Sequence, residues 1–167
     1  MKLLALGIVG IFVAQAQQPA SVATSAKGAY TRIKNNFVKA AEKMPEENYG
    51  FKPVDALETF GQRVAHIADP QLGTCTGLTG ARKTGMAKSK TSKAELVAAI
   101  KESFDACDKA FDALTDANAL EAVSAGRGQQ PRIAVLYGLI AHANEVYGAM
   151  GVYMRLKGIV PPSSEGR

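Results

Sequence analysis

The sequence predicts an all-α protein built as a single four-helix bundle. Four segments place apolar residues at the three- and four-residue steps of an amphipathic helix. No stretch shows the sustained alternation of apolar and polar residues that is typical of a strand. About thirteen residues separate the second and third segments, more than the roughly 2 to 8 residues of a short link between antiparallel helices. Such a link can cross the length of the bundle, which allows an up-down-down-up order with helices two and three parallel.

The first sixteen residues have the features of a secretory signal peptide. Lys2 forms a short positive region, residues 3–14 are an unbroken apolar run, and Ala14-Gln15-Ala16 is a small-x-small cleavage signal. The run has twelve residues, whereas a spanning helix needs roughly 20, so a retained membrane anchor is the weaker interpretation. We expect cleavage after Ala16, a single domain over residues 17–167, no stable membrane anchor after cleavage, and export to the periplasm or the extracellular space.

The first helix is expected over residues 21–44, where apolar side chains recur at helical spacing. Two prolines and a glycine within residues 45–53 then break it. The second helix is expected over residues 54–78. Pro70 falls inside this segment and should kink the helix or end its regular part, because a proline there removes one backbone hydrogen bond.

A Gly- and Lys-rich segment over residues 79–91 links the second and third helices and carries part of the excess positive charge. The chain has 20 Lys and Arg against 15 Asp and Glu, a net charge of +5. Basic stretches can contact nucleic acid or anionic membranes. This one has no interleaved aromatic residue for stacking on bases, and an exported protein rarely meets nucleic acid. We therefore interpret it as a solvated loop and expect no nucleic-acid partner.

The third and fourth helices have recognisable ends. Ser92, with Glu95 three positions later, forms a capping box that starts the third helix, whose apolar stripe continues to Leu114. A polar, Gly-rich gap follows. Pro131 suits the first turn of the fourth helix, which we expect to run to the residue before Gly158, a C-terminal stop.

The two cysteines lie on different predicted helices, Cys75 near the end of the second and Cys107 about two thirds along the third. If these helices are parallel, both can reach a similar height, and export favours oxidation. A disulfide is our first interpretation, and two buried thiols are the alternative. A Cys-x-x-Cys redox centre or a thiolate zinc site is not supported, because the cysteines are thirty-two positions apart with no nearby histidine.

The chain has two histidines, His66 and His142, on the second and fourth predicted helices. On a helical wheel at about 100° per residue, His142 sits at the edge of an apolar stripe, and His66 lies on the polar side of its helix. A rim or cleft position fits both better than the core. Two distant histidines suggest a metal site, but they are too few to prove one.

Four parts of the chain resemble the DinB-like superfamily, also called DinB/YfiT-like. They are residues 40–45 with 49–53, residues 59–67, residues 95–114 and residues 142–162. The resemblance implies an up-down-down-up four-helix bundle. It also implies a metal site, commonly zinc or nickel, made by one histidine on helix two and a His-x-x-x-His pair on helix four. His66 matches the first ligand and His142 the second, and Val146 occupies the third position.

The valine at the third position changes what the site can be. Val146 has no donor atom, whereas catalytic zinc ordinarily uses three protein ligands and an open position. Glu145 is adjacent, although the wheel points it about 100° away, and Asp69 lies one turn after His66. Three interpretations stay open: a functional metal site, a degraded or weakly occupied two-histidine site, and an unrelated role for both histidines.

The resemblance suggests a metal-dependent hydrolase or thiol transferase, in which the ion lowers the pKa of a bound water or thiol. His66 and His142 would be ligands, with Asp69 or Glu145 completing the shell or acting as base. Thiol transfer is awkward outside the cytoplasm, where low-molecular-weight thiols are scarce. The sequence does not identify catalytic residues or a substrate, and a homodimer is compatible with it.

The alternative is a non-catalytic bundle of the same type that binds a small apolar ligand or a protein partner. Its pocket would lie between helices two and four. Candidate lining residues are the aromatic and methionine side chains of the fourth helix, namely Tyr147, Met150, Tyr153 and Met154. Such stripes are more often part of the core.

Overall fold

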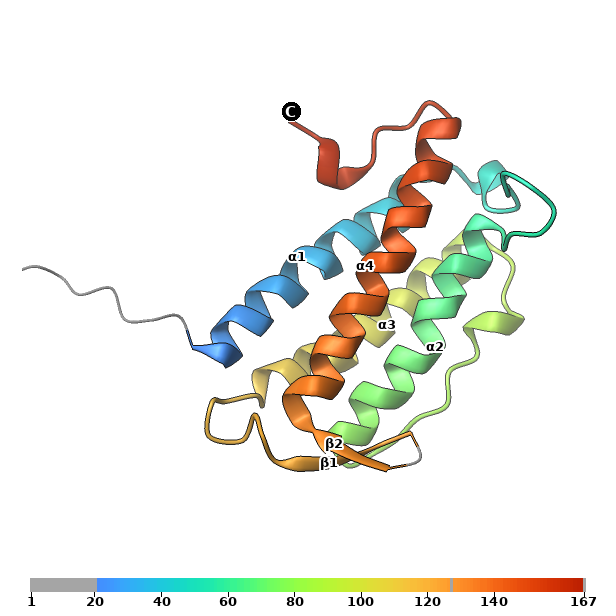
Figure 1. Ribbon diagram of the computed structural model, residues 1–167. Coiled ribbons are helices and arrows are strands. Elements are labelled where there is room, and N and C mark those ends of the chain that lie inside the picture. The colour runs from blue at the N-terminus through green and yellow to red at the C-terminus, as the bar shows by residue number, and fades with distance from the viewer. Residues whose placement is uncertain (1–20, 127, 167) are drawn as a thin grey trace, which may run out of the picture.

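The computed structural model describes residues 21–126 and 128–166, and the segment interpreted as a signal peptide lies outside them. The all-α prediction is confirmed: four long helices form a bundle (Figure 1). They are α1 (Val22–Lys43), α2 (Phe60–Leu78), α3 (Lys93–Asp112) and α4 (Arg132–Leu156). The smaller elements are the short 3-10 helices η1 (Glu46–Asn48), η2 (Ala87–Ser89) and η3 (Pro162–Ser164) and the strands β1 (Ala122–Ala125) and β2 (Gly128–Pro131).

Helices α2 and α3 run parallel, in register with each other. The disulfide Cys75–Cys107 and the hydrogen bond from Gln71 to Ser103 each join residues 32 positions apart, so the two helices advance together. Helix α1 runs opposite to α3, and α4 runs opposite to α2 (Figure 1). The up-down-down-up order that the long link allowed is therefore the observed one.

The α2–α3 interface is joined covalently and by a buried polar pair. Cys75 and Cys107 are fully buried, and their Cα atoms are 4.9 Å apart. One turn earlier on each helix, the Gln71 amide donates to the Ser103 hydroxyl at 3.2 Å. That hydroxyl donates to the Ile100 carbonyl at 2.9 Å, so both buried polar side chains are satisfied. The expected disulfide is present in the fold.

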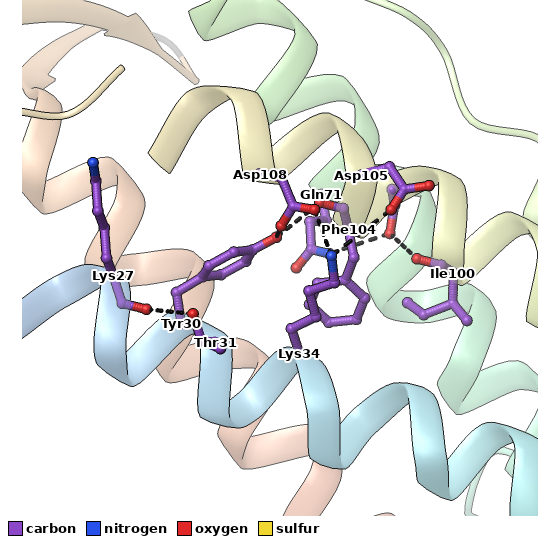
Figure 2. Close-up of polar contacts among 10 residues, drawn as sticks. Lys27, Tyr30, Thr31, Lys34, Gln71, Ile100, Phe104, Asp105 and Asp108 are labelled. Atoms are coloured by element: carbon purple, nitrogen blue, oxygen red, sulfur yellow. Dashed lines mark hydrogen bonds and ion pairs between the residues drawn. The ribbon is translucent and has the colours of Figure 1, made fainter. Parts of the chain in front are cut away.

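Tyr30 lies at the centre of the α1–α3 interface (Figure 2). Its hydroxyl is 2.7 Å from the carbonyl oxygen of Phe104 and 2.8 Å from Oδ1 of Asp108, and its ring stacks on Phe111. Lys34 pairs with the other oxygen of Asp108 at 2.5 Å. Burial, and then the hydrogen bond to Asp108, raise the pKa of the Tyr30 phenol far above its ordinary value. The phenol is therefore a fixed structural donor.

Helix α2 begins at Phe60, six residues later than the sequence pattern indicated. A reciprocal cap sets this start: the Gln62 amide donates to the Thr59 hydroxyl at 3.2 Å, and the Thr59 amide donates to the Gln62 side chain at 2.8 Å. Of the two outcomes expected at Pro70, a kink or an end of the regular part, the second does not occur, because the helix continues through Pro70 to Leu78.

The hairpin formed by β1 and β2 was missed by the sequence analysis. Ala122 pairs with Pro131 and Ala125 with Gly128, and Gly126 adopts φ +59° in the turn. Each strand has only four residues and none is buried, so no apolar alternation can reveal it. The same pairing makes Pro131 the cap before α4 rather than a residue of its first turn.

Helix α4 ends in a Schellman motif around Gly158. The Gly158 amide donates to the Arg155 carbonyl at 3.0 Å, and the Ile159 amide donates to the Met154 carbonyl at 2.9 Å. Gly158 takes φ +72°, a conformation that other L-residues adopt at a cost. The chain then turns back so that η3 lies near α1 (Figure 1).

We expect Gly158→Ala to lower the free energy of unfolding by roughly 1–2 kcal/mol, because alanine is strained at positive φ. The matched control is Gly148→Ala on α4, where an added Cβ meets nothing within 4 Å. This control should raise the free energy by roughly 0.5–1 kcal/mol. Urea unfolding of both variants measures the difference, and equal effects would contradict the assigned cap.

Replacing both cysteines by alanine should lower the free energy of unfolding by roughly 3–4 kcal/mol, because the disulfide closes a loop spanning 32 positions in the unfolded chain. Chemical unfolding with and without dithiothreitol measures this loss. Dithiothreitol should destabilise the wild-type protein and leave the double variant unchanged. A wild-type protein indifferent to the reductant would show that the two sulfurs are not joined.

Stability should fall as the pH rises above about 10. Burial raises the pKa of Tyr30 and of Tyr49, whereas tyrosines of the unfolded chain ionise near 10. The protonated phenols therefore contribute fully below about pH 10, and their contribution is lost as the unfolded chain ionises above it. Unfolding measured from pH 8 to 11 should give a shallower slope in Tyr30→Phe than in Tyr137→Phe, whose ring is exposed.

Candidate histidine site

The structure brings His66 of α2 and His142 of α4 together at the α2–α4 interface. Their ring centroids are 5.1 Å apart, with an angle of 54° between the ring planes. The His66 side chain is 37% exposed and the His142 side chain 41% exposed. Both rings therefore lie at the rim expected from the helical wheels, and solvent and small solutes can reach them.

Each histidine has a carboxylate beside its Nδ1 atom. Glu58 Oε1 is 3.5 Å from Nδ1 of His66, and Glu145 Oε2 is 3.5 Å from Nδ1 of His142. A carboxylate on this side favours a proton on Nδ1 and leaves Nε2 as the acceptor. Glu145 is an expected site residue, and its side chain is 80% exposed, in line with the predicted solvent-facing direction.

Glu58 is the site residue that the sequence analysis missed. The second helix was expected from residue 54, but Glu58 lies before the Thr59 cap and outside α2, so a helical wheel drawn on the expected helix does not apply to it. Tyr153 of α4 fixes it by donating its hydroxyl proton to the Glu58 carbonyl at 2.9 Å. Nε of Arg63 lies 3.5 Å from the other carboxylate oxygen. Glu58 therefore stands between Arg63 and His66.

The third-ligand position has no donor. Val146 is 3% exposed and belongs to the hydrophobic core. Asp69, the other candidate, holds the crossover loop, the segment over residues 79–92 that links α2 to α3. Its Oδ1 accepts from the Ala87 amide at 2.7 Å and its Oδ2 from the Lys88 amide at 3.0 Å. Across residues 21–126 and 128–166, no three His, Cys, Asp or Glu side chains are grouped to hold a metal.

The aromatic and methionine residues considered for an apolar pocket are part of the core. Tyr147, Met150, Tyr153 and Met154 are all at most 8% exposed. The hydroxyl of Tyr147 accepts from the Ser163 amide at 2.9 Å, so it holds the C-terminal segment against α4. These four side chains therefore belong to the hydrophobic core, as is usual for such a stripe at helical spacing.

A groove of about 650 Å³ does lie between α2 and α4, beside the histidines. The crossover loop and the hairpin complete its walls. Asp69 and Leu139 line it, and each is three positions from a histidine, about 4.5 Å along a helix axis. The groove and the histidine pair therefore share the same interhelical face.

Comparison with protein families agrees with this architecture. The profile of the DinB superfamily matches residues 29–148, well over half of the chain. The chain belongs to the DinB superfamily. The match covers both histidines, the disulfide and the groove-lining parts of α2 and α4, so these features lie within the DinB domain.

A solved structure shows the same DinB fold. The crystal structure of a DinB-like protein from Bacillus cereus ATCC 10987 superposes with a TM-score of 0.68 at 20% sequence identity. The similarity covers 82% of this chain and 93% of that chain. The curated proteins include no significant match. At this identity the comparison establishes the bundle, and the chemistry has to come from the residues themselves.

None of the helices within the described residues is long and apolar enough to cross a membrane.

Proposed function

We propose that this DinB-superfamily protein is exported and binds one divalent ion, zinc or nickel, through His66 and His142. The observation that carries the proposal is the 5.1 Å separation of the two ring centroids. Imidazoles that share one tetrahedral zinc, each with a metal–nitrogen bond of roughly 2.0–2.1 Å, have centroids about 5 Å apart. The observed separation of the two rings therefore supports one ion shared between them.

The carboxylates beside the rings support the same proposal. Metal-binding histidines usually present their second ring nitrogen to a carboxylate or carbonyl, which fixes the tautomer and raises the basicity of the ligand. Glu58 and Glu145 stand in these positions for His66 and His142, respectively. Both Nε2 atoms are then the acceptors available to an ion.

The residues fit a two-histidine site and not a three-histidine site, because Val146 is apolar and buried. We therefore expect weak, exchangeable binding, with the remaining positions open to water or substrate. A bound ion would lower the pKa of a coordinated water and so supply a nucleophile for hydrolysis. Glu58 and Glu145 would orient the ligands, and the half-exposed rim would admit the substrate.

Export rests on two features. The first sixteen residues have a positive start, an apolar run and a small-x-small cleavage signal. The Cys75–Cys107 disulfide suits an oxidising compartment, where such bonds persist. Hydrolysis fits this location better than thiol transfer, which requires a pool of small thiols.

Equilibrium dialysis against zinc or nickel, with metal analysis of the protein, tests the proposal. Wild-type protein should bind about one ion per chain, and His66→Ala and His142→Ala should each abolish binding. Glu58→Gln should weaken binding by roughly 10- to 100-fold, the usual cost of losing such a partner. Glu47→Gln is the control, since Glu47 is exposed and lies outside the site.

A protein that stays metal-free, and whose stability is unchanged by both histidine substitutions, would refute the metal site. The buried Val146 favours a second candidate function in that case, a non-catalytic bundle that binds a small ligand. The separation of 5.1 Å would then be an ordinary contact between two rings, which commonly pack 4.5–7 Å apart.

A further inference from the structure

We propose that the groove between α2 and α4 is an anion-binding site for a small organic molecule that carries a phosphate, sulfate or carboxylate group. Its volume of about 650 Å³ falls within the roughly 300–1,000 Å³ of small-molecule sites. The proposal concerns binding and does not depend on a metal at the histidines. It gives a role to the basic crossover loop, which the sequence pattern indicated only as a solvated segment.

Unpaired positive charge reaches the groove from the crossover loop. Arg82, Lys83 and Lys88 all line it. Lys83 pairs with Glu102 of α3 at 3.5 Å, whereas Arg82 and Lys88 have no ion pair with any residue that the structure describes. An arginine guanidinium binds oxyanions through two parallel hydrogen bonds, and a lysine adds a point charge.

The only carboxylate lining the groove, among the described residues, is already engaged. Both oxygens of Asp69 accept backbone hydrogen bonds, from the amides of Ala87 and Lys88. Asp69 keeps its single negative charge, which is outnumbered by the two positive charges of Arg82 and Lys88. The local balance of charge in the groove therefore favours an anionic ligand.

The loop that carries these cations is held against α2 at several points. Thr76 accepts from the Lys83 amide at 2.8 Å through its hydroxyl and from the Ala81 amide at 2.9 Å through its carbonyl. Gly85 permits the close approach, because a Cβ there would lie 2.7 Å from the Asp69 Cα. A fixed backbone reduces the ordering that a ligand must impose on the loop.

Glycines on α2 and α4 leave space for the groove. Gly73 and Gly77 of α2 and Gly138 of α4 line it. An added Cβ at Gly138 would meet nothing within 4 Å, so packing does not require a glycine there. A glycine inside a helix costs roughly 0.5–1 kcal/mol relative to alanine. The effect of Gly138 in this fold is to keep the groove open.

Neutral polar groups add hydrogen-bonding capacity around the cations. Thr74 of α2, Thr84 of the loop and Gln130 of the hairpin line the groove. None of their side chains has a hydrogen-bond partner among the residues that the structure describes. Together with Arg82 and Lys88, they form a mixed charged and neutral donor set from three separate elements.

Titration of ¹⁵N-labelled, metal-free protein with inorganic phosphate and, separately, with acetate at constant ionic strength tests the proposal. We expect saturable shifts of groove amides such as Gly73, Gly77 and Gly138. Saturation by phosphate alone indicates a phosphate or sulfate ester, and saturation by acetate alone indicates a carboxylic acid. Saturation by neither anion, or shifts no larger than with chloride, overturns the proposal.

Substitutions separate the groove from general surface charge. Arg82→Gln with Lys88→Gln should weaken binding by about ten-fold or more, since a hydrogen bond to a charged group contributes roughly 1.5–3 kcal/mol. The charge-matched control is Lys93→Gln with Lys109→Gln, which lies outside the groove. An equal loss in the control would show non-specific attraction and overturn the site.

A second pair of variants tests the location of the site by placing a large side chain inside or outside the groove. Gly138→Leu should fill the groove and abolish saturation, whereas Gly148→Leu on the same helix should leave it unchanged, because Gly148 has equally open space but does not line the groove. Retained binding in Gly138→Leu overturns the location. His66→Ala and His142→Ala should keep anion binding, so failure of the metal site and failure of the groove are distinguishable.

Discussion

The parallel, in-register packing of α2 on α3 is the constraint from which the rest of the architecture follows. The disulfide between Cys75 and Cys107 and the polar pair below it fix the two helices at the same height. Parallel neighbours cannot be joined by a tight turn, because the chain must return along the full length of the bundle. That return is the crossover loop, which carries basic residues and lies along α2. The groove wall is thus a consequence of the helix order.

The two halves of the bundle carry different kinds of polar chemistry. Between α1 and α3, the hydroxyl of Tyr30 and the ammonium of Lys34 both contact the Asp108 carboxylate, at 2.8 and 2.5 Å (Figure 2). Between α2 and α4, each half-exposed histidine lies 3.5 Å from a carboxylate, and the exposed Arg82 and Lys88 have no ion pair with any residue that the structure describes. Satisfied networks rigidify a fold, whereas unsatisfied groups at a rim remain available to a ligand. The α2–α4 face is therefore where function is expected.

Buried residues of α4 position the segments that surround the histidine pair. Tyr153, buried on α4, holds the carbonyl of Glu58, and the Glu58 side chain in turn approaches His66. Gly158 ends α4 and turns the chain so that Ser163 can bond to Tyr147. The buried face of α4 thus holds both the segment with Glu58 and the C-terminal segment with Ser163, while His142 lies at the exposed edge of the helix. Val146 belongs to the buried face and has no donor atom, so the third-ligand position contributes to packing and not to ligation.

Local sequence features determined the four helices, the caps at Ser92 and Gly158, and the apolar faces that form the core. They could do so because helical periodicity and capping are decided within a few residues. The sequence pattern did not reveal the late start of α2, the uninterrupted passage through Pro70, or the exposed hairpin, where local signals were weak or misleading. Only the tertiary structure brought Glu58 to His66, turned Asp69 toward the loop and opened a groove beside the histidines. These contacts join segments that are separate in the chain, and their geometry depends on how whole helices pack, which no local pattern encodes.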